Sequence, residues 1–323
     1  MAPKVLLTGV TGFVGGTAFS KIHDAHPDYD YTLYIRSEDR AKIISEKYPK
    51  VKFVYGDLAS TDVIEKAASE ADVVVHTGES ADSLPAAKAI AKGLASGHSA
   101  ENPGYYIHLS GAGILTWYDL KNQRYGEPPL PEQNYHDIND IDRILNLPDE
   151  AIHKDVDNAV QSIDSDVVKF LIVSPGVIHG TGLGLFNKTS MTVPGLDLAD
   201  FFNKAIEATQ DPSKKEDPEI WGKKGYYFVS GGEHQWKDLA TWVADEVHRQ
   251  GYIPESRTQS VKFEDVIKQG YKAGIAWAIN SKGEAERARK FLGWEPKAPS
   301  LKDTIPDSVT WEAEILDLKP KYK

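Results

Sequence analysis

The run Thr8-Gly9-Val10-Thr11-Gly12-Phe13-Val14-Gly15 stands near the beginning of the chain and decides its fold. It follows the apolar segment Lys-Val-Leu-Leu at 4–7 and opens a segment with helical spacing. The first glycine permits a tight turn, the second lets the backbone approach a diphosphate, and the third lets a helix pack closely on a strand. Phosphates bind at such a helix N-terminus because its backbone N–H groups are free. The run therefore predicts a Rossmann-type domain that binds a nicotinamide dinucleotide.

Short apolar segments alternate with longer segments that are compatible with helices. The predicted strands are 5–8, 31–35, 52–55, 72–75, 105–109, 169–174 and 225–230, and the predicted helices are 15–25, 40–47, 61–69, 84–94, 151–163, 236–250 and 281–292. This alternation is typical of βαβ units, and near-continuous apolar strands indicate helices on both faces of a parallel sheet. We expect an α/β doubly wound parallel sheet, with a dinucleotide-binding domain at 1–182 and a smaller, partly interleaved substrate-binding region at 183–323.

Composition excludes several classes of function. The chain has 323 residues, a formal net charge of −11 and no cysteine, so it has no disulfide framework, thiolate metal site or cysteine nucleophile. The acidic balance argues against a nucleic-acid partner, which requires basic residues to neutralise phosphates. The sequence contains no apolar run of about 18 residues and no secretion signal, so we expect a cytoplasmic protein without a membrane partner. His23 and His26 are interpreted as a solvated helix end, and no metal is expected.

The spacing T-G-x-x-G-x-x-G resembles that of the short-chain dehydrogenase/reductase superfamily, and of its extended, epimerase/dehydratase-like branch in particular. Other segments resemble this branch too: Gly56-Asp57-Leu58, Val75-His76-Thr77-Gly78, His108-Leu109-Ser110, Ser174-Pro175-Gly176-Val177-Ile178-His179-Gly180 and Leu292-Gly293-Trp294-Glu295-Pro296. The resemblance implies an NAD(P)-binding Rossmann fold. It implies that the cofactor contacts residues on these segments and on the glycine loop, namely Thr8, Gly9, Thr11, Gly12, Phe13, Val14, Asp57, Leu58, Thr77, Gly78, Pro175, Gly176 and Val177.

The end of the second predicted strand discriminates between NADP and NAD. A carboxylate at this point accepts hydrogen bonds from ribose hydroxyls, whereas an arginine pairs with a 2′-phosphate. The chain has Arg36 there, followed by Arg40 and Lys42. These residues favour NADP, while Glu38 and Asp39 keep NAD as the alternative.

Catalysis in the superfamily uses a Tyr-x-x-x-Lys pair on one helix face and a serine that orients the substrate carbonyl. Lys154 resembles the family lysine, which implies a contact with the nicotinamide ribose, and Glu150 stands at the tyrosine position. The protein therefore resembles an atypical member of the superfamily. Ser110 is the candidate for the polar role at the end of its strand.

A different residue must then supply the proton. Tyr118 is the candidate nearest in sequence to Ser110, and Tyr125, Tyr135 and the His153 beside Lys154 are alternatives. Glu150 qualifies as a base only if burial raises its pKa.

Three functions are compatible with these features. The leading hypothesis is an NADP-dependent oxidoreductase that transfers hydride to or from a small carbonyl or alcohol substrate. The alternatives are a non-catalytic, NmrA-like dinucleotide-sensing regulator and a nucleotide-sugar epimerase or dehydratase. A homodimer is compatible with the extended branch.

Overall fold

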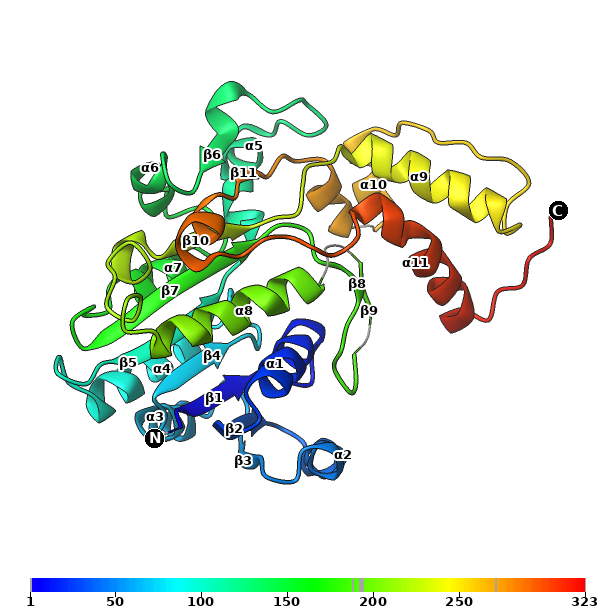
Figure 1. Ribbon diagram of the computed structural model, residues 1–323. Helices are drawn as coiled ribbons and strands as arrows, with labels where there is room; N and C mark the ends of the chain where they lie inside the picture. Colours follow the sequence, from blue (N-terminus) through cyan, green and yellow to red (C-terminus); the bar gives the residue numbers. More distant parts are fainter. Residues whose placement is uncertain (1, 188, 192–194, 271, 323) are drawn as a thin grey trace.

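The fold is centred on seven parallel strands, as shown by a computed structural model that describes residues 2–187, 189–191, 195–270 and 272–322 (Figure 1). In sheet order the strands are β10 (Tyr226–Val229), β7 (Val168–Pro175), β5 (Gly104–Leu109), β4 (Val73–His76), β1 (Lys4–Thr8), β2 (Asp30–Ile35) and β3 (Lys52–Tyr55). Every neighbouring pair is parallel, so all seven carboxyl ends meet at one edge. The predicted doubly wound fold is confirmed.

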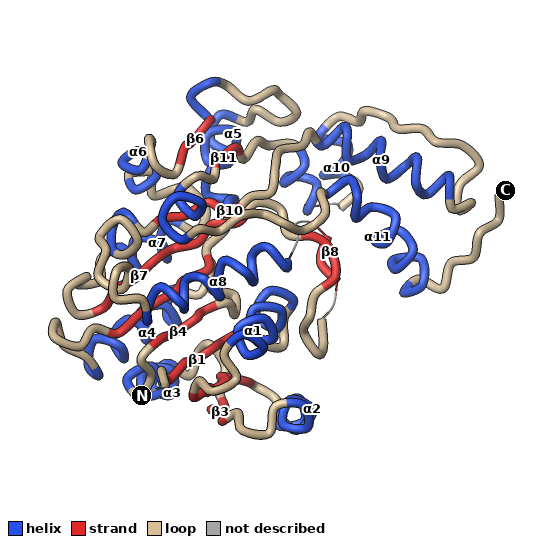
Figure 2. Tube along the Cα trace, viewed as in Figure 1, coloured by secondary structure: helices blue, strands red, loops and turns tan. Residues whose placement is uncertain are grey.

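Helices cover both faces of this sheet (Figure 2). One face packs against α1 (Phe13–Ala25), α2 (Glu38–Lys47) and α8 (Gly195–Gln210), and the other against α3 (Thr61–Ser69), α4 (Leu84–Gly97) and α7 (Lys154–Gln161). Strand side chains alternate between the two cores: Val5 and Leu7 face the first, and Leu6 faces the second. Buried apolar residues on both faces explain the near-continuous apolar strands.

The long segment after β5 has structure of its own. It contains η1 (Ala112–Thr116), α5 (Trp117–Asn122), η2 (Pro131–Gln133), β6 (Asn134–His136) and α6 (Ile141–Leu145). Strand β6 pairs in parallel with β11 (Lys282–Glu284). Residues 282–284 are therefore a strand rather than part of the helix predicted at 281–292, and only the short helix η5 (Ala288–Leu292) follows them. The prediction was wrong there because the β6 pairing is non-local.

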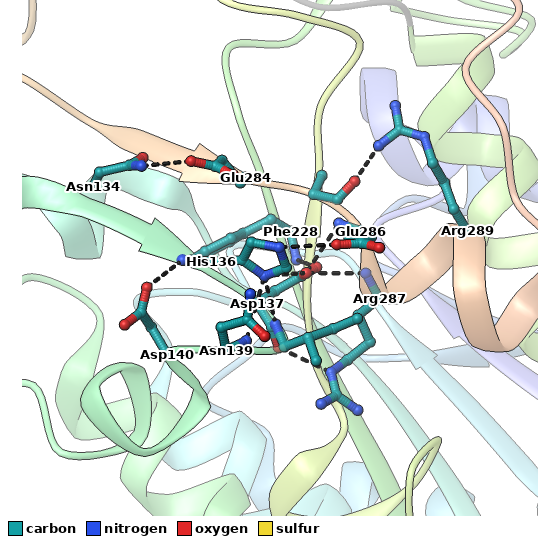
Figure 3. Close-up of polar contacts among 12 residues, drawn as sticks. Asn134, His136, Asp137, Asn139, Asp140, Phe228, Glu284, Glu286, Arg287 and Arg289 are labelled. Atoms are coloured by element: carbon teal, nitrogen blue, oxygen red, sulfur yellow. Dashed lines mark hydrogen bonds and ion pairs between the residues drawn. The ribbon is translucent and has the colours of Figure 1, made fainter.

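Asp137 joins this segment to β10 and to the residues directly after β11 (Figure 3). Its fully buried carboxylate accepts backbone N–H groups of Phe228, Glu286 and Arg287 at 2.9–3.1 Å. The Arg287 Nε in turn donates to the Asp137 carbonyl at 3.0 Å. One carboxylate thus connects β6, β10 and the segment after β11.

The remaining elements follow residue 175. They are β8 (His179–Thr181), antiparallel to β9 (Thr189–Met191), then η3 (Gly222–Lys224), α9 (Trp236–Arg249), α10 (Phe263–Lys268), η4 (Lys272–Trp277) and α11 (Leu301–Ile315). Helices α9 and α11 lie side by side, at the right in Figure 1. Within the described ranges, no helix combines the length and apolar character needed to span a bilayer.

Candidate active site

The glycine loop forms the turn between β1 and α1. Gly9 has a φ of +74°, and a Cβ there would lie 2.6 Å from the backbone nitrogen of Gly78. Gly12 caps α1 and donates its N–H to the Gly9 carbonyl at 2.9 Å. No side chain caps this helix end and no acidic residue occupies its first turn, which leaves N–H groups and a positive dipole end for an anion. The geometry fits a diphosphate.

Thr8 connects this turn to the end of β4. Its Oγ1 accepts the N–H of Thr77 at 3.1 Å and lies 2.7 Å from Nδ1 of His76. The Thr77 hydroxyl donates to the Thr8 carbonyl at 2.7 Å. Burial lowers the pKa of His76 to about 3, so its ring is neutral. The side chain of Thr8 therefore supports the glycine loop through its contacts with β4.

Arg36 directly follows β2 and is exposed at the carboxyl edge of the sheet. The next residue, Ser37, caps α2 by accepting the N–H of Arg40 at 3.3 Å. Arg40 lies over the ring of Phe186, 5.2 Å from its centroid. Arg36 thus lies at the end of the strand beside the glycine loop, because β2 is the neighbour of β1.

Asp57 begins the turn that leads from β3 to α3. Its carboxylate accepts the Ser60 hydroxyl at 2.8 Å and the Ala59 N–H at 3.0 Å, and these bonds hold its pKa below the usual value. The Tyr34 hydroxyl donates to the Asp57 carbonyl at 2.7 Å. Leu58 follows and is half-buried. The predicted Asp-Leu pair is therefore held at the edge of the sheet by its own turn.

The end of β7 lies on the opposite side of the glycine loop. Pro175 is its last residue, and the N–H of Gly176 donates to the Val229 carbonyl of β10 at 3.2 Å. A Cβ on Gly176 would meet no described atom within 4 Å, so the space beside it is open, and Val177 is half-buried. Phe13 is tightly packed by comparison: its ring lies against Gly195, where an added Cβ would come within 2.6 Å of the ring.

A buried polar cluster lies beneath α7, where β5 and β7 end and beside the first residue of β10. The Asp157 carboxylate accepts the Tyr226 hydroxyl at 2.8 Å. Burial raises the pKa of Asp157 to about 6, against the opposing effect of the Ser110 and Tyr226 hydroxyls. Oγ of Ser110, Oγ of Ser174 and Oδ1 of Asp157 make no hydrogen bond of normal geometry to the described part of the chain. Unpaired buried oxygens cost stability, so the cluster is a candidate for function.

The lysine predicted for the ribose contact points into the interior. Lys154 is buried, and its Nζ donates to the Leu145 carbonyl at 2.6 Å. Burial lowers the pKa of Lys154. Glu150 is exposed and pairs with Lys121 at 2.6 Å, which holds the pKa of Glu150 below its usual value. The burial that a Glu150 base requires is therefore not present.

The three candidate tyrosines have different surroundings. Tyr118 is half-buried on α5 and lines a surface hollow with Trp117 and Tyr135. The Tyr135 hydroxyl accepts the Trp117 indole N–H at 3.0 Å. Tyr125 stacks on Phe263 with ring centroids 3.9 Å apart. The contacts described for these three rings join them to residues other than Ser110.

His153, the residue before α7, makes a contact that the sequence did not predict. Its Nδ1 lies 2.8 Å from Oδ1 of Asp82, in the loop between β4 and α4. The sequence pattern does not relate Asp82 to His153, because the two residues stand 71 positions apart and have no local spacing. Both residues lie near the carboxyl edge of the sheet.

Comparison with known proteins agrees with this geometry. The family model described as NAD(P)H-binding matches residues 9–183, just over half of the chain. The chain belongs to the NAD(P)H-binding family. The match begins within the glycine loop and extends past β8, so it confirms the NAD(P)-binding Rossmann fold predicted from the loop.

Relatives of this NAD(P)H-binding chain cover nearly all of it. The protein "Oxidase ucsJ" of Acremonium sp. is 30% identical over 351 aligned positions, which cover 98% of this chain and 100% of the relative. The Pseudomonas aeruginosa protein PA4631, a nucleoside-diphosphate-sugar epimerase, has a TM-score of 0.62 at 14% identity, with 99% and 100% of the chains covered. Yeast methylglyoxal/isovaleraldehyde reductase Gre2, complexed with NADPH, has a TM-score of 0.54 at 16% identity, with 97% and 99% covered. The chain therefore shares the fold of these epimerase and reductase structures.

Proposed function

We propose that this protein is an NADP-dependent oxidoreductase that transfers hydride to or from a small carbonyl or alcohol. The observation that carries the proposal is the buried Ser110 hydroxyl, which lies beside the Asp157 carboxylate but makes no hydrogen bond of normal geometry to the described residues. It lies at the end of β5, next to the strand whose end opens at Gly176. Free hydrogen-bonding capacity at this point suits an enzyme, because a substrate carbonyl would accept a hydrogen bond from the hydroxyl.

The residues have distinct roles in this proposal. N–H groups in the first turn of α1 hold the diphosphate, and Arg36 pairs with the 2′-phosphate. Ser110 donates to the carbonyl oxygen and orients it. Bound NADPH supplies the hydride for reduction of the carbonyl carbon. A relative called an oxidase and a fold neighbour that is an NADPH-bound reductase support this class of reaction.

Titration of the purified protein with NADPH and NADH, followed by nicotinamide fluorescence, tests the cofactor. NADPH is expected to bind at least about tenfold more tightly, because a charged phosphate contact contributes roughly 1.5–3 kcal/mol. Arg36→Ala should abolish the preference. Arg257→Ala is the matched control, because Arg257 is exposed and pairs with Glu255 in the segment after α9. A clear preference for NADH would contradict NADP.

Turnover is tested with methylglyoxal and isovaleraldehyde as probe aldehydes, followed by the loss of NADPH absorbance. We expect the protein to reduce at least one of the two aldehydes, and Ser110→Ala should lower the rate strongly. Tight NADPH binding with no turnover of either probe would instead support the sensor.

A further inference from the structure

We propose that His153, held by Asp82, is the acid–base residue that exchanges a proton with the substrate oxygen. This proposal rests on the proposed function and names the proton donor for it. His153 directly precedes α7, the helix that leads into β7, and Asp82 comes from the loop after β4. Their 2.8 Å contact therefore joins two loops at the edge where the dinucleotide site lies. A base oriented by a carboxylate from another element is a recurrent catalytic arrangement.

The backbone of His153 indicates that the ring is placed for more than helix capping. Its φ is +68°, in the left-handed region, which is strained for a residue with a side chain. His153 is the N-cap of α7, yet its side chain makes no capping hydrogen bond. Ser, Thr or Asp would stabilise that helix end better. The strained backbone instead directs the imidazole towards Asp82.

The other ring nitrogen faces the two glycines of the turn after Ser110. A Cβ on Gly111 would lie 3.1 Å from Nε2 of His153, and a Cβ on Gly113 would lie 3.2 Å from it. This turn directly follows Ser110 at the end of β5. Two glycines therefore leave the backbone close to Nε2 but add no side chain that would cover it. The His153 side chain is 16% exposed, so part of the imidazole is open to solvent.

The charged and titratable groups around the ring suit proton exchange. Asp82 contacts the ring directly and is itself exposed. His108 and Asp157 lie beneath, close enough to interact electrostatically with His153. Burial lowers the pKa of His108 well below its usual value, so that ring is neutral. The neighbouring Lys154 ammonium is directed away, to the Leu145 carbonyl.

The proposed step balances in atoms and charge. Hydride from NADPH forms the new C–H bond at the carbonyl carbon, and the cofactor ends as NADP⁺. The C=O π electron pair moves to oxygen, which takes the proton from Nε2–H of protonated His153. The ring becomes neutral and keeps its Nδ1–H on Asp82. A proton from solvent restores the ring, and alcohol oxidation follows the same steps in reverse.

The test compares wild type with His153→Asn, chosen because asparagine tolerates left-handed backbone. With the probe aldehydes, kcat is expected to fall about 100-fold or more, the usual contribution of a general acid. The Kd of NADPH should stay within about twofold, because the variant leaves the phosphate contacts intact. His248→Asn is the matched control, because His248 lies on α9 and the hydrogen bond described for its ring is to the Ile253 carbonyl.

A second readout does not depend on turnover. In the protein labelled with ¹⁵N-histidine, the neutral His153 ring is expected to carry its proton on Nδ1, and Asp82→Ala should shift it towards Nε2. A wild-type ring with the proton on Nε2 would overturn the proposed orientation. If wild type reduces the aldehydes and His153→Asn retains kcat within about threefold, the role of His153 is overturned while the oxidoreductase stands. If wild type binds no NADPH or reduces neither aldehyde, the proposed function fails and this proposal fails with it.

Discussion

Gly9 combines a left-handed backbone with close packing, and the two effects can be separated. Its φ is +74°, and an added Cβ would press on the Gly78 nitrogen. Gly126 has a similar φ of +78°, but a Cβ there would meet no described atom within 4 Å. Gly126→Ala should therefore cost only the backbone strain of about 1 kcal/mol, and Gly9→Ala about 3 kcal/mol or more. Urea unfolding measures both, and equal costs would show that packing around Gly9 is unimportant.

Gly9→Ala should also weaken NADPH binding by about tenfold or more, since the phosphate-binding turn must shift. Gly126→Ala should bind NADPH as wild type does. Fluorescence titration provides this comparison.

Asp157 gives the protein a pH dependence of definite sign. Its pKa is raised from 3.8 to about 6 in the folded state, so between these values the folded protein holds a proton that the unfolded chain has lost. The unfolding free energy therefore falls as pH rises from about 4 to 6. Asp157→Asn should lack this fall, because asparagine does not titrate. Over this pH range the unfolding free energy of the variant should rise relative to that of wild type by up to about 3 kcal/mol, at roughly 1.4 kcal/mol per pKa unit.

Urea unfolding at several pH values between about 4 and 7 measures this difference. The groups that face Asp157 are Tyr226, Ser110, His153 and Lys154. A difference that is constant with pH would show that Asp157 is ionised in the folded protein throughout the range.

At the level of elements, the Asp137 side chain should contribute far more to the stability of the fold than that of its neighbour Asp140. Asp137→Ala leaves the N–H groups of Phe228, Glu286 and Arg287 unpaired in the interior, and an expected cost of 3–5 kcal/mol follows. Asp140 is partly exposed and bonds the His136 N–H and Arg143, so Asp140→Ala should cost about 1 kcal/mol. Thermal and urea unfolding compare the two, and similar losses would contradict the connecting role of Asp137.

Local pattern predicted most elements of the sheet, because strand and helix periodicity is a property of neighbouring residues. Helix α8 was missed although Leu198, Phe201, Phe202, Ala205 and Ile206 are all fully buried at helical spacing. It follows an irregular segment outside the simple alternation. The strand β11 was predicted as helix because only its pairing with β6, far away in sequence, makes it a strand.

The two parts of the candidate site also differ in how far the sequence predicts them. The glycine loop was predictable because its residues are adjacent and each glycine has a local reason. His153 and Asp82 stand 71 positions apart, and Asp157 and Tyr226 stand 69 apart. Such pairs are brought together by strand order, so their chemistry depends on the tertiary structure.

For the whole molecule, the two predicted regions share one sheet. Strand β10 follows residue 183 and pairs with β7, and α8 packs against α1 and the face of β4 and β5. Trp294, fully buried, donates its indole N–H to the Asp197 carbonyl of α8 at 2.8 Å. The dinucleotide domain therefore depends on residues from the second region for its edge strand and one of its covering helices.

A fragment of residues 1–182 is accordingly expected not to fold. Without α8 it exposes the apolar face that Phe201 and Phe202 cover, and without β10 it leaves β7 as an unpaired edge, which promotes aggregation. A fragment of residues 1–298 keeps both elements and Trp294 and loses only α11 and the residues after it. It should unfold cooperatively and bind NADPH. Circular dichroism during heating and fluorescence titration compare the two, and cooperative unfolding with NADPH binding by 1–182 would show that the domain ends where the family match does.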